Sequence, residues 1–290
     1  MAQRETRGTV VITGGTDGLG KAAALLLAER GYKVYATGRS AERRAQLEAI
    51  ARERKLPLAA VEMDVREDGS VRHTVDHILA KENAIDVLIN NAGVGYVAAV
   101  EDLRLEDLRQ QYETNIFGVL RATQAVLPGM RARKRGRILM VSSVAGLVTP
   151  PTYGAYSSSK FALEALSNAL RLELYPFGIH VVLIESGYIL TNFQQTAREL
   201  AEPYAAKAAG GPYAKVYAGA WKGASDARKS SKSRPEDFAK VVLRSVEAAR
   251  PKARYGVTPL AALAKWGKRL VSDRMGDRFL RWKYGVPGPS

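Results

Sequence analysis

Cysteine is absent from this 290-residue chain, and histidine occurs only three times, at His73, His77 and His180. Without cysteine there is no disulfide framework and no thiolate metal site. His73 and His77 are four residues apart and could share one helix face, but no third ligand stands near them in the sequence. We therefore predict no metal site and place these two histidines on a solvated helix.

The chain also lacks long apolar runs. No uninterrupted apolar stretch approaches the roughly 20 residues of a membrane-spanning helix. The first seven residues carry no apolar signal core. The length suits one domain with a large core. These observations predict a cytoplasmic protein of a single domain.

A glycine-rich turn near the N-terminus carries the first functional signal. Thr9 to Thr13 form an apolar run typical of a buried strand, and residues 14–20 then read Gly-Gly-Thr-Asp-Gly-Leu-Gly. Apolar residues at helical spacing follow, up to Gly31. Glycines at 14, 18 and 20 permit a tight turn and close approach of the backbone to a pyrophosphate at the helix N-terminus. The segment therefore predicts a dinucleotide cradle.

Strand-like and helix-like segments alternate along the chain, as a parallel sheet with crossover helices requires. After the first strand, we predict strands at residues 34–37, 58–62, 87–90, 137–141, 179–184 and 254–257. The sequence thus predicts the α/β class: a Rossmann-type doubly wound parallel sheet, with helices on both faces, in a single domain.

Tyr156 and Lys160 carry the second signal. Four-residue spacing on a helix puts both side chains on the same face. A phenol has a pKa of about 10, but a nearby cation favours the phenolate and lowers that pKa, which makes tyrosine usable in proton transfer. The alternative is a buried ring beside a solvated charge, and spacing alone does not separate the two.

Several motifs together resemble those of the short-chain dehydrogenases/reductases, in the compact single-domain branch of that family. They are Thr-Gly-x-x-x-Gly-x-Gly at residues 13–20, Asn-Asn-Ala-Gly at 90–93, Asn115, Ser142-Ser143 and Tyr-x-x-x-Lys at 156–160. They stand in the family's order and, with Thr191, span about two thirds of the chain.

The resemblance implies hydride transfer between a nicotinamide and a carbonyl carbon. In that chemistry Tyr156 is the general acid or base toward the substrate oxygen. Lys160 lowers the pKa of Tyr156 and holds the nicotinamide ribose, and Ser143 donates a hydrogen bond to the same substrate oxygen. Ser142 is structural. Asn115 places a water beside the lysine, and the alternative interpretation is a polar residue that kinks a helix.

The end of the second predicted strand bears on the choice of cofactor. Family members that use NAD usually carry an acidic residue there, where this chain has Gly38 followed by Arg39. A small residue beside a guanidinium admits the 2′-phosphate of NADP, whereas the carboxylate of Asp17 opposes it. We predict NADP(H), with NAD(H) as the alternative. The residues expected at the cofactor are Gly14, Thr16, Asp17, Gly18, Leu19, Gly20, Arg39, Asp64, Val65, Asn91, Ala92, Gly93, Tyr156, Lys160, Gly187 and Thr191.

After the sixth predicted strand, where the family has Pro-Gly, Ser186 replaces the proline and Gly187 matches the glycine, and we expect a looser backbone there. Residues 192–234 are predicted as a substrate lid with Gly210 and Gly211 as hinges. The lid contains a low-complexity stretch at 229–233 that is typical of a mobile loop. The predicted core comprises residues 7–191 and the last strand, and residues 258–290 form a basic amphipathic tail.

Positive charge is concentrated in the last third of the chain. From residue 192 onward there are 20 basic and 8 acidic residues, which contribute +12 of the formal net charge of +15. Aromatic and basic residues interleave at helical spacing near 265–270 and 278–284. Such a tail could lie on anionic lipid or bind an acidic carrier protein, coenzyme A or nucleic acid. The interpretation we favour is a surface helix that packs against the core or a second subunit through Leu263, Trp266, Leu270 and Phe279.

We therefore predict an NADP(H)-dependent oxidoreductase that interconverts a ketone and a secondary alcohol in a largely apolar, steroid-, retinoid- or acyl-like compound. One alternative is a non-catalytic NADP-sensing regulator, which has no need of Ser143, Tyr156 and Lys160 together. The other is a membrane-surface or nucleic-acid-binding protein, for which the tail lacks a known binding module. The resemblance also implies a homodimer or homotetramer through the helix of Tyr156. The apolar residues of that helix, which could equally face the protein's own core, are Phe161, Leu163, Leu166 and Leu170.

Overall fold

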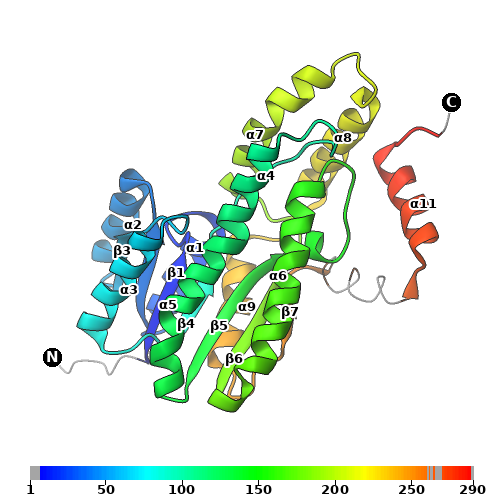
Figure 1. The fold of residues 1–290 in the computed structure, drawn as a ribbon. Coiled ribbons are helices and arrows are strands. Elements are labelled where there is room, and N and C mark those ends of the chain that lie inside the picture. The colour runs from blue at the N-terminus through cyan, green and yellow to red at the C-terminus, as the bar shows by residue number, and fades with distance from the viewer. Residues whose placement is uncertain (1–6, 260, 262–263, 265–269, 289–290) are drawn as a thin grey trace.

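The computed structural model describes residues 7–259, 261, 264 and 270–288 (Figure 1). Within them, one sheet of seven parallel strands has the order β3-β2-β1-β4-β5-β6-β7. The strands are β1 (Thr9–Thr13), β2 (Lys33–Gly38), β3 (Leu58–Glu62), β4 (Val87–Asn90), β5 (Gly136–Ser143), β6 (Ile179–Ser186) and β7 (Arg254–Gly256). The predicted doubly wound parallel sheet is confirmed, and β5 and β6 each extend two residues further toward the carboxyl end than predicted.

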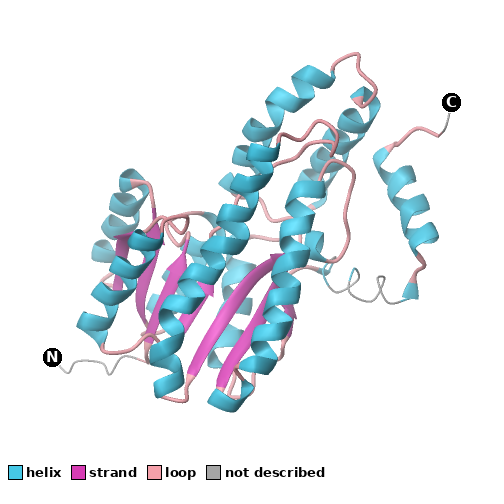
Figure 2. Ribbon diagram, viewed as in Figure 1, coloured by secondary structure: helices cyan, strands magenta, loops and turns pink. Residues whose placement is uncertain are grey.

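Helices cover both faces of the sheet (Figures 1 and 2). Side chains of α1, α2 and α9 pack on one face, and side chains of α3, α5 and α6 pack on the other. The helices are α1 (Gly18–Glu29), α2 (Ala41–Glu53), α3 (Asp68–Glu82), α4 (Leu105–Tyr112), α5 (Gly118–Ala132), α6 (Gly154–Glu173), α7 (Asn192–Ala208), α8 (Ala214–Ser230), α9 (Pro235–Glu247) and α11 (Asp273–Tyr284). His73 and His77 are exposed on α3, as predicted.

The central strands are mainly apolar because the sheet is buried on both faces. In β1, Val10 and Ile12 enter the core beneath α1 and α9, and Val11 enters the core beneath α3 and α5. The strand order reverses between β1 and β4, which are hydrogen-bonded neighbours. In open α/β sheets, a ligand crevice forms at the carboxyl ends of the strands at this point.

Two helices, α7 and α8, project beyond the carboxyl ends of the strands (Figure 1). They occupy most of residues 192–234, and Gly210, with φ +78°, lies in the turn between them. The predicted mobile loop at 229–233 is wrong in part, because α8 continues to Ser230. Beyond it, the Ser231 hydroxyl donates to the Tyr188 carbonyl oxygen at 2.7 Å.

Two expectations about apolar faces change with the structure. On α6, Leu163 is buried in the core and Leu166 and Leu170 pack against it, so these three residues face the protein's own interior. In the tail, Leu270 and Phe279 are 80% and 53% exposed, so they do not pack against the core. Packing against a second subunit, the other half of that interpretation, stays a prediction. Leu263 and Trp266, named in the same interpretation, lie outside the described residues.

Candidate active site

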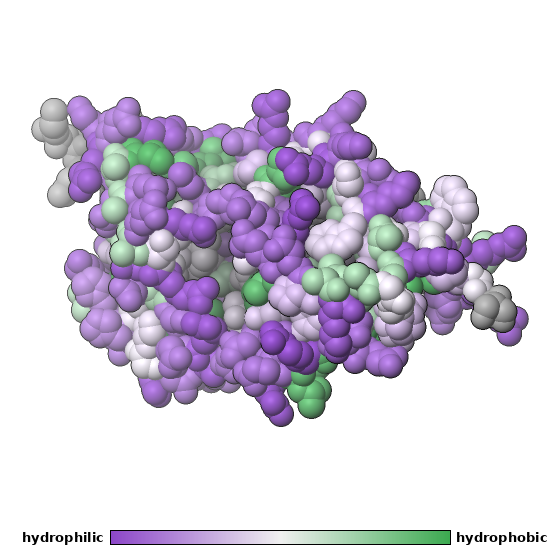
Figure 3. All heavy atoms as spheres, turned by 90° about the horizontal axis from the view of Figure 1, so that it is seen from above, coloured by the Kyte–Doolittle hydropathy of each residue, from purple (hydrophilic) through white to green (hydrophobic). Residues whose placement is uncertain are grey.

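A cleft of about 2790 Å³ opens at the carboxyl ends of the strands, between the sheet and the helices α7, α8 and α11. Figure 3 looks onto this end of the molecule, where pale and apolar atoms show within a rim of hydrophilic ones. Nearly all the residues that the sequence analysis assigned to catalysis or cofactor binding line this cleft. The two exceptions are Gly20 and Asn115.

The turn between β1 and α1 forms the floor of one half of the cleft. Gly14 has φ +61°, and a Cβ there would lie 2.9 Å from the Cα of Ala92, so only glycine fits without strain. Asp17 caps α1 by accepting a hydrogen bond from the Gly18 N–H at 2.8 Å. Gly20 lies beneath the turn, where a Cβ would approach the Gly14 carbonyl oxygen to 2.4 Å. The turn therefore offers a helix N-terminus and close backbone access, which suits a pyrophosphate.

Arginine side chains gather where the adenosine half of a dinucleotide would lie. Arg39 is 3.9 Å from Asp64, and Arg43 is 3.0 Å from Asp17. Burial acts to raise the pKa of Asp64, but hydrogen bonds from Arg66 outweigh it and the pKa is lowered. Arg43 was not predicted from the sequence, because its position in the first turn of α2 gains meaning only when α2 lies beside the glycine turn.

Gly38, at the end of β2, marks the position where an acidic residue would indicate NAD. A Cβ at Gly38 would lie 2.3 Å from the Thr16 hydroxyl oxygen. The contact leaves no room for a side chain there unless Thr16 moves. The second strand therefore ends without a carboxylate, next to the Arg39 side chain.

The other half of the cleft holds the predicted catalytic group. Tyr156 and Lys160 lie one turn apart on α6, with the lysine Nζ 5.7 Å from the centroid of the phenol ring. Lys160 is 5% exposed, and its Nζ donates to the Val141 carbonyl oxygen at 2.9 Å. Ser143, at the end of β5, forms a side-chain hydrogen bond with Tyr156. The structure thus brings Ser143, Tyr156 and Lys160 together.

Burial controls the protonation of this group. It raises the pKa of Tyr156 to about 12, against the lowering effect of the hydrogen bond with Ser143. It lowers the pKa of Lys160 to about 8, against the raising effect of the Glu164 carboxylate. Desolvation of the phenol therefore dominates the pKa of Tyr156 in the protein alone. That Lys160 lowers this pKa stays a prediction.

A buried ionic network holds α6 on the sheet beneath Lys160. The Ser142 hydroxyl donates to Glu164 at 2.5 Å, and Glu164 also forms an ion pair with Arg254 of β7. Arg254 contacts Glu185 of β6 at 2.5 Å. Ser142 thus links β5 to α6, which agrees with its predicted structural role.

Asn115 lies in a short π-helix, Glu113–Phe117, between α4 and α5. Its side chain bonds both the N–H and the carbonyl oxygen of Val94, at 2.9 and 3.0 Å, and donates to Ser159 at 3.0 Å. Gln111, one turn earlier, bonds the Val94 carbonyl oxygen and the Tyr96 N–H. Both residues therefore fix the loop after β4. Gln111 was not predicted from the sequence, although its four-residue spacing from Asn115 was a usable signal.

The segment after β6 covers Tyr156. The Phe193 ring lies 5.6 Å from the Tyr156 ring, a contact that the sequence analysis missed. Ser186 is the last residue of β6, and its hydroxyl donates to the Ser142 carbonyl oxygen at 3.4 Å, so the backbone is tied to the sheet where we expected it to be looser. Thr191 caps α7, with Gln194 completing the capping box.

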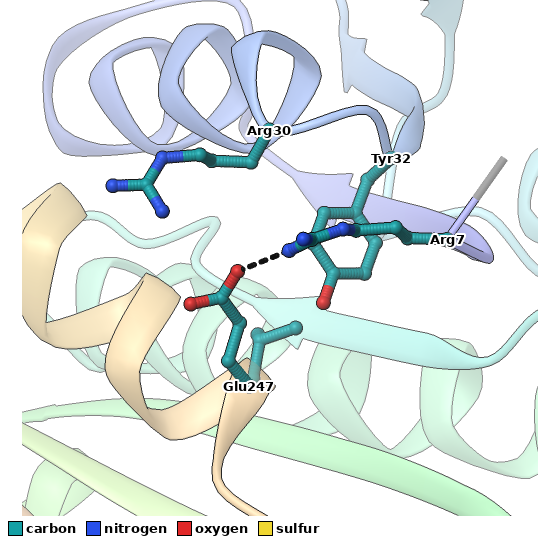
Figure 4. Close-up of a pocket in the computed structure, with 5 residues that line it drawn as sticks. Arg7, Arg30, Tyr32 and Glu247 are labelled. Carbon is teal, nitrogen blue, oxygen red and sulfur yellow. Dashed lines mark hydrogen bonds and ion pairs between the residues drawn. The ribbon is translucent and has the colours of Figure 1, made fainter. Parts of the chain in front are cut away.

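A smaller hollow of about 470 Å³ lies at the amino ends of the strands (Figure 4). Arg7 and Glu247 form an ion pair across it at 2.7 Å. It contains no residue assigned to catalysis or cofactor binding. Among the described residues, no group of His, Asp and Glu is placed to hold a metal ion. A membrane-spanning helix is likewise not found in the described part of the chain.

Comparisons with known proteins agree with this geometry. A family model described as short chain dehydrogenase matches residues 8–202. The 3-ketodihydrosphingosine reductase of Bacteroides thetaiotaomicron is 42% identical over 184 residues, which cover 63% of this chain and just under two thirds (65%) of that relative. The NADPH-dependent 3-dehydrocapnine reductase of Ornithobacterium rhinotracheale is 33% identical over 276 residues, or 92% of this chain and 94% of the relative.

Among solved structures, a short-chain dehydrogenase from Streptomyces avermitilis superposes with a TM-score of 0.75 at 26% identity, covering 97% of this chain and 98% of that one. The match of the family model extends over more than half of the chain and contains the glycine turn, Asn115, Ser143, Tyr156 and Lys160. The chain therefore belongs to the short-chain dehydrogenases/reductases and is an NAD(P)-dependent oxidoreductase.

Proposed function

We propose that this protein uses NADPH to reduce a ketone in a long, largely apolar compound to a secondary alcohol. The observation that carries the proposal is the meeting of Ser143, Tyr156 and Lys160 in one cleft with the glycine turn of β1 and α1. A regulator that only senses the cofactor would not need the three polar side chains beside an apolar cleft.

When bound, NADPH would supply the hydride to the carbonyl carbon. Tyr156 would donate its proton to the carbonyl oxygen, and Ser143 would donate a hydrogen bond to the same atom as negative charge develops. Because burial raises the pKa of Tyr156 to about 12, the phenol is protonated at neutral pH and suited to act as an acid. Lys160 would hold the nicotinamide ribose hydroxyls. Asn115 would hold the loop after β4 and, as the family resemblance implies, a water beside the lysine.

Three features support NADP(H) over NAD(H). Gly38 leaves the end of β2 without a carboxylate, and Arg39 and Arg43 both line the cleft beside it. The charge of Asp17, which opposed NADP in the sequence, is partnered by Arg43 at 3.0 Å. Guanidinium groups bind phosphate through paired hydrogen bonds. The name of the Ornithobacterium relative also specifies NADPH.

The substrate class rests on the lining of the cleft. Beyond Tyr156, its walls carry apolar side chains from the loop after β5, from α7 and α8, and from α11; these include Val148, Leu200, Trp221 and Met275. Burial of apolar surface favours a substrate with a long hydrocarbon part. The names of both relatives denote reductases of a 3-keto or 3-dehydro compound, which supports reduction of a ketone.

The test is NADPH oxidation with a panel of long-chain, steroid and retinoid ketones, by the wild type and by Tyr156→Phe. We expect turnover of a long-chain ketone by the wild type. Removal of the proton donor should lower kcat at least about 100-fold and leave NADPH binding intact. Tyr175→Phe removes an exposed phenol from the surface and should behave as wild type. Wild-type turnover by Tyr156→Phe would contradict the catalytic assignment.

A further inference from the structure

The C-terminal helix α11 lies apart from the sheet, at the rim of the cleft (Figure 1). Its inner stripe consists of Gly276, Leu280 and Tyr284, which are partly buried. Tyr284 packs on α8 at two glycines: a Cβ at Gly219 would lie 1.7 Å from the Tyr284 carbonyl oxygen, and one at Gly223 would lie 2.4 Å from the tyrosine ring. This close fit fixes which face of α11 points away from the body.

The outward face of α11 carries an apolar stripe. Met275, Phe279 and Trp282 are spaced by four and three residues, so they form one stripe along the helix. They are 62%, 53% and 78% exposed, and the rings of Phe279 and Trp282 lie 6.0 Å apart. Exposed apolar side chains are normal when scattered, but a contiguous stripe marks an interaction surface.

Cations flank this stripe on both sides. At 100° per residue, Arg274, Arg278 and Arg281 follow one edge, and Lys283 lies on the other with its Nζ 5.8 Å from the Phe279 ring. None of the four forms an ion pair with a described residue. The acidic residues Asp273 and Asp277 fall on the opposite side of the helix, beside Tyr284. The three arginines and the apolar stripe therefore share the outward face, Lys283 lies at its edge toward the cleft, and negative charge is absent from that face.

We propose that the outward face of α11 docks on an anionic lipid surface. A helix lies in a membrane interface when aromatic and aliphatic side chains occupy one face and Lys and Arg flank it, because the apolar groups enter the acyl boundary and the cations meet anionic headgroups. The net charge of +12 from residue 192 onward adds to the attraction. A nucleic acid or an acidic peptide would use the cations but would leave Met275 and Trp282 in water.

The docking surface is continuous with the cleft. Met275 and Phe279 line the cleft as well as the outward stripe. On a membrane, the mouth of the cleft would open at the acyl boundary, where a long-chain ketone resides. This second step rests on the proposed function, whereas the docking itself does not depend on it.

The test is co-sedimentation of the full chain with two kinds of vesicle, one of phosphatidylcholine alone and one of phosphatidylglycerol and phosphatidylcholine in equal parts. We expect binding to the anionic vesicles only, weakened by high salt. R274Q/R278Q/R281Q, which removes three cations outside the cleft lining, should lower vesicle affinity at least about tenfold. Trp282→Ser should weaken it as well. R52Q/R72Q/R131Q removes the same charge from α2, α3 and α5 and should bind as wild type.

Absence of binding to either vesicle would overturn the proposal, and so would an equal loss of vesicle affinity in the matched control variant. A dimer that forms without lipid and that Trp282→Ser dissociates would also overturn it, because the face would then bind a second copy of this chain. NADPH binding and turnover of a ketone in detergent solution, measured on the same variants, report the proposed function separately. Loss of vesicle binding with unchanged turnover therefore tests docking alone.

Discussion

If NADPH is the cofactor, as proposed, removal of Arg39 or Arg43 should weaken binding of NADPH and not of NADH. Both line the cleft at the end of β2, where a 2′-phosphate would lie in NADP and is absent from NAD. We expect Arg39→Ala to raise the Kd for NADPH about tenfold or more, since a charge-assisted hydrogen bond contributes about 1.5–3 kcal/mol. The Kd for NADH should change little. Fluorescence titration with both cofactors measures the difference.

Arg43→Ala tests the same contact and also leaves the Asp17 carboxylate without its ion pair, so that its charge opposes the 2′-phosphate. We expect a larger loss of NADPH affinity than in Arg39→Ala. Arg52→Ala, on the exposed side of the same helix, is the matched control. Equal effects on NADPH and NADH would argue against a phosphate contact at either arginine.

The site residues that could be predicted from the sequence are those that lie close together along the chain. Tyr156 and Lys160 share a helix, so their spacing alone places them together, and the glycine turn is contained in consecutive residues. Phe193 reaches Tyr156 from a segment 37 residues away in the chain. Arg43 reaches Asp17 from the following helix. Such contacts depend on how elements pack, which the periodicity of one sequence does not encode.

At the scale of elements, α7 and α8 are tied to the body by tyrosines that meet carboxylates. The buried Tyr204 hydroxyl donates to Asp107, and that of Tyr217 donates to Asp102 at 3.0 Å. Tyr217 also accepts a hydrogen bond from the Ala99 N–H at 2.9 Å. These contacts fix the predicted lid against α4 and the segment that leads into it.

We expect Tyr204→Phe/Tyr217→Phe to loosen α7 and α8 selectively. Tyr217→Phe leaves the Ala99 N–H without its acceptor, at a cost of about 1–3 kcal/mol. Tyr204→Phe removes one hydrogen bond from the buried Asp107 carboxylate, which keeps its contacts with Arg104. Hydrogen exchange should accelerate in α7 and α8 by at least about tenfold, with β1, β4 and β5 unchanged. Tyr213→Phe removes a similar contact with Glu101 at the exposed surface and is the control. Unchanged exchange in α7 and α8 would show that apolar packing alone holds them.

The strands of the sheet were predicted almost to the residue, whereas the segment after β6 was not. Buried strands are short apolar runs with β-branched residues, and this pattern can be recognised in a segment without knowledge of the rest of the fold. The low-complexity residues at 229–233 suggested a loop, yet α8 continues to Ser230. On α11, the sequence predicted an amphipathic helix, but only the packing of Tyr284 on Gly219 and Gly223 shows which face is outward.

At the scale of the whole molecule, buried tyrosines make the folded protein less stable at alkaline pH. Burial raises the pKa values of Tyr153, Tyr156 and Tyr217 to about 12, and raises that of Tyr35 as well. An unfolded tyrosine has a pKa of about 10. From pH 10 upward the unfolded chain therefore releases protons that the folded chain retains, so the free energy of unfolding falls as pH rises.

Lys160 makes the free energy of unfolding rise with pH, over a lower pH range than the tyrosines. Its pKa is about 8 when folded and about 10.4 when unfolded, so between these values the unfolded chain binds the extra proton and stability rises with pH. We expect urea unfolding to show a rise in stability above pH 8 and a steep fall above pH 10. Lys160→Met should remove the rise and retain the fall. Tyrosinate absorbance of the folded protein shows whether its buried phenols stay protonated above pH 10. If all thirteen tyrosines titrated together near pH 10 while the protein remained folded, burial would not protect the phenols and this prediction would fail.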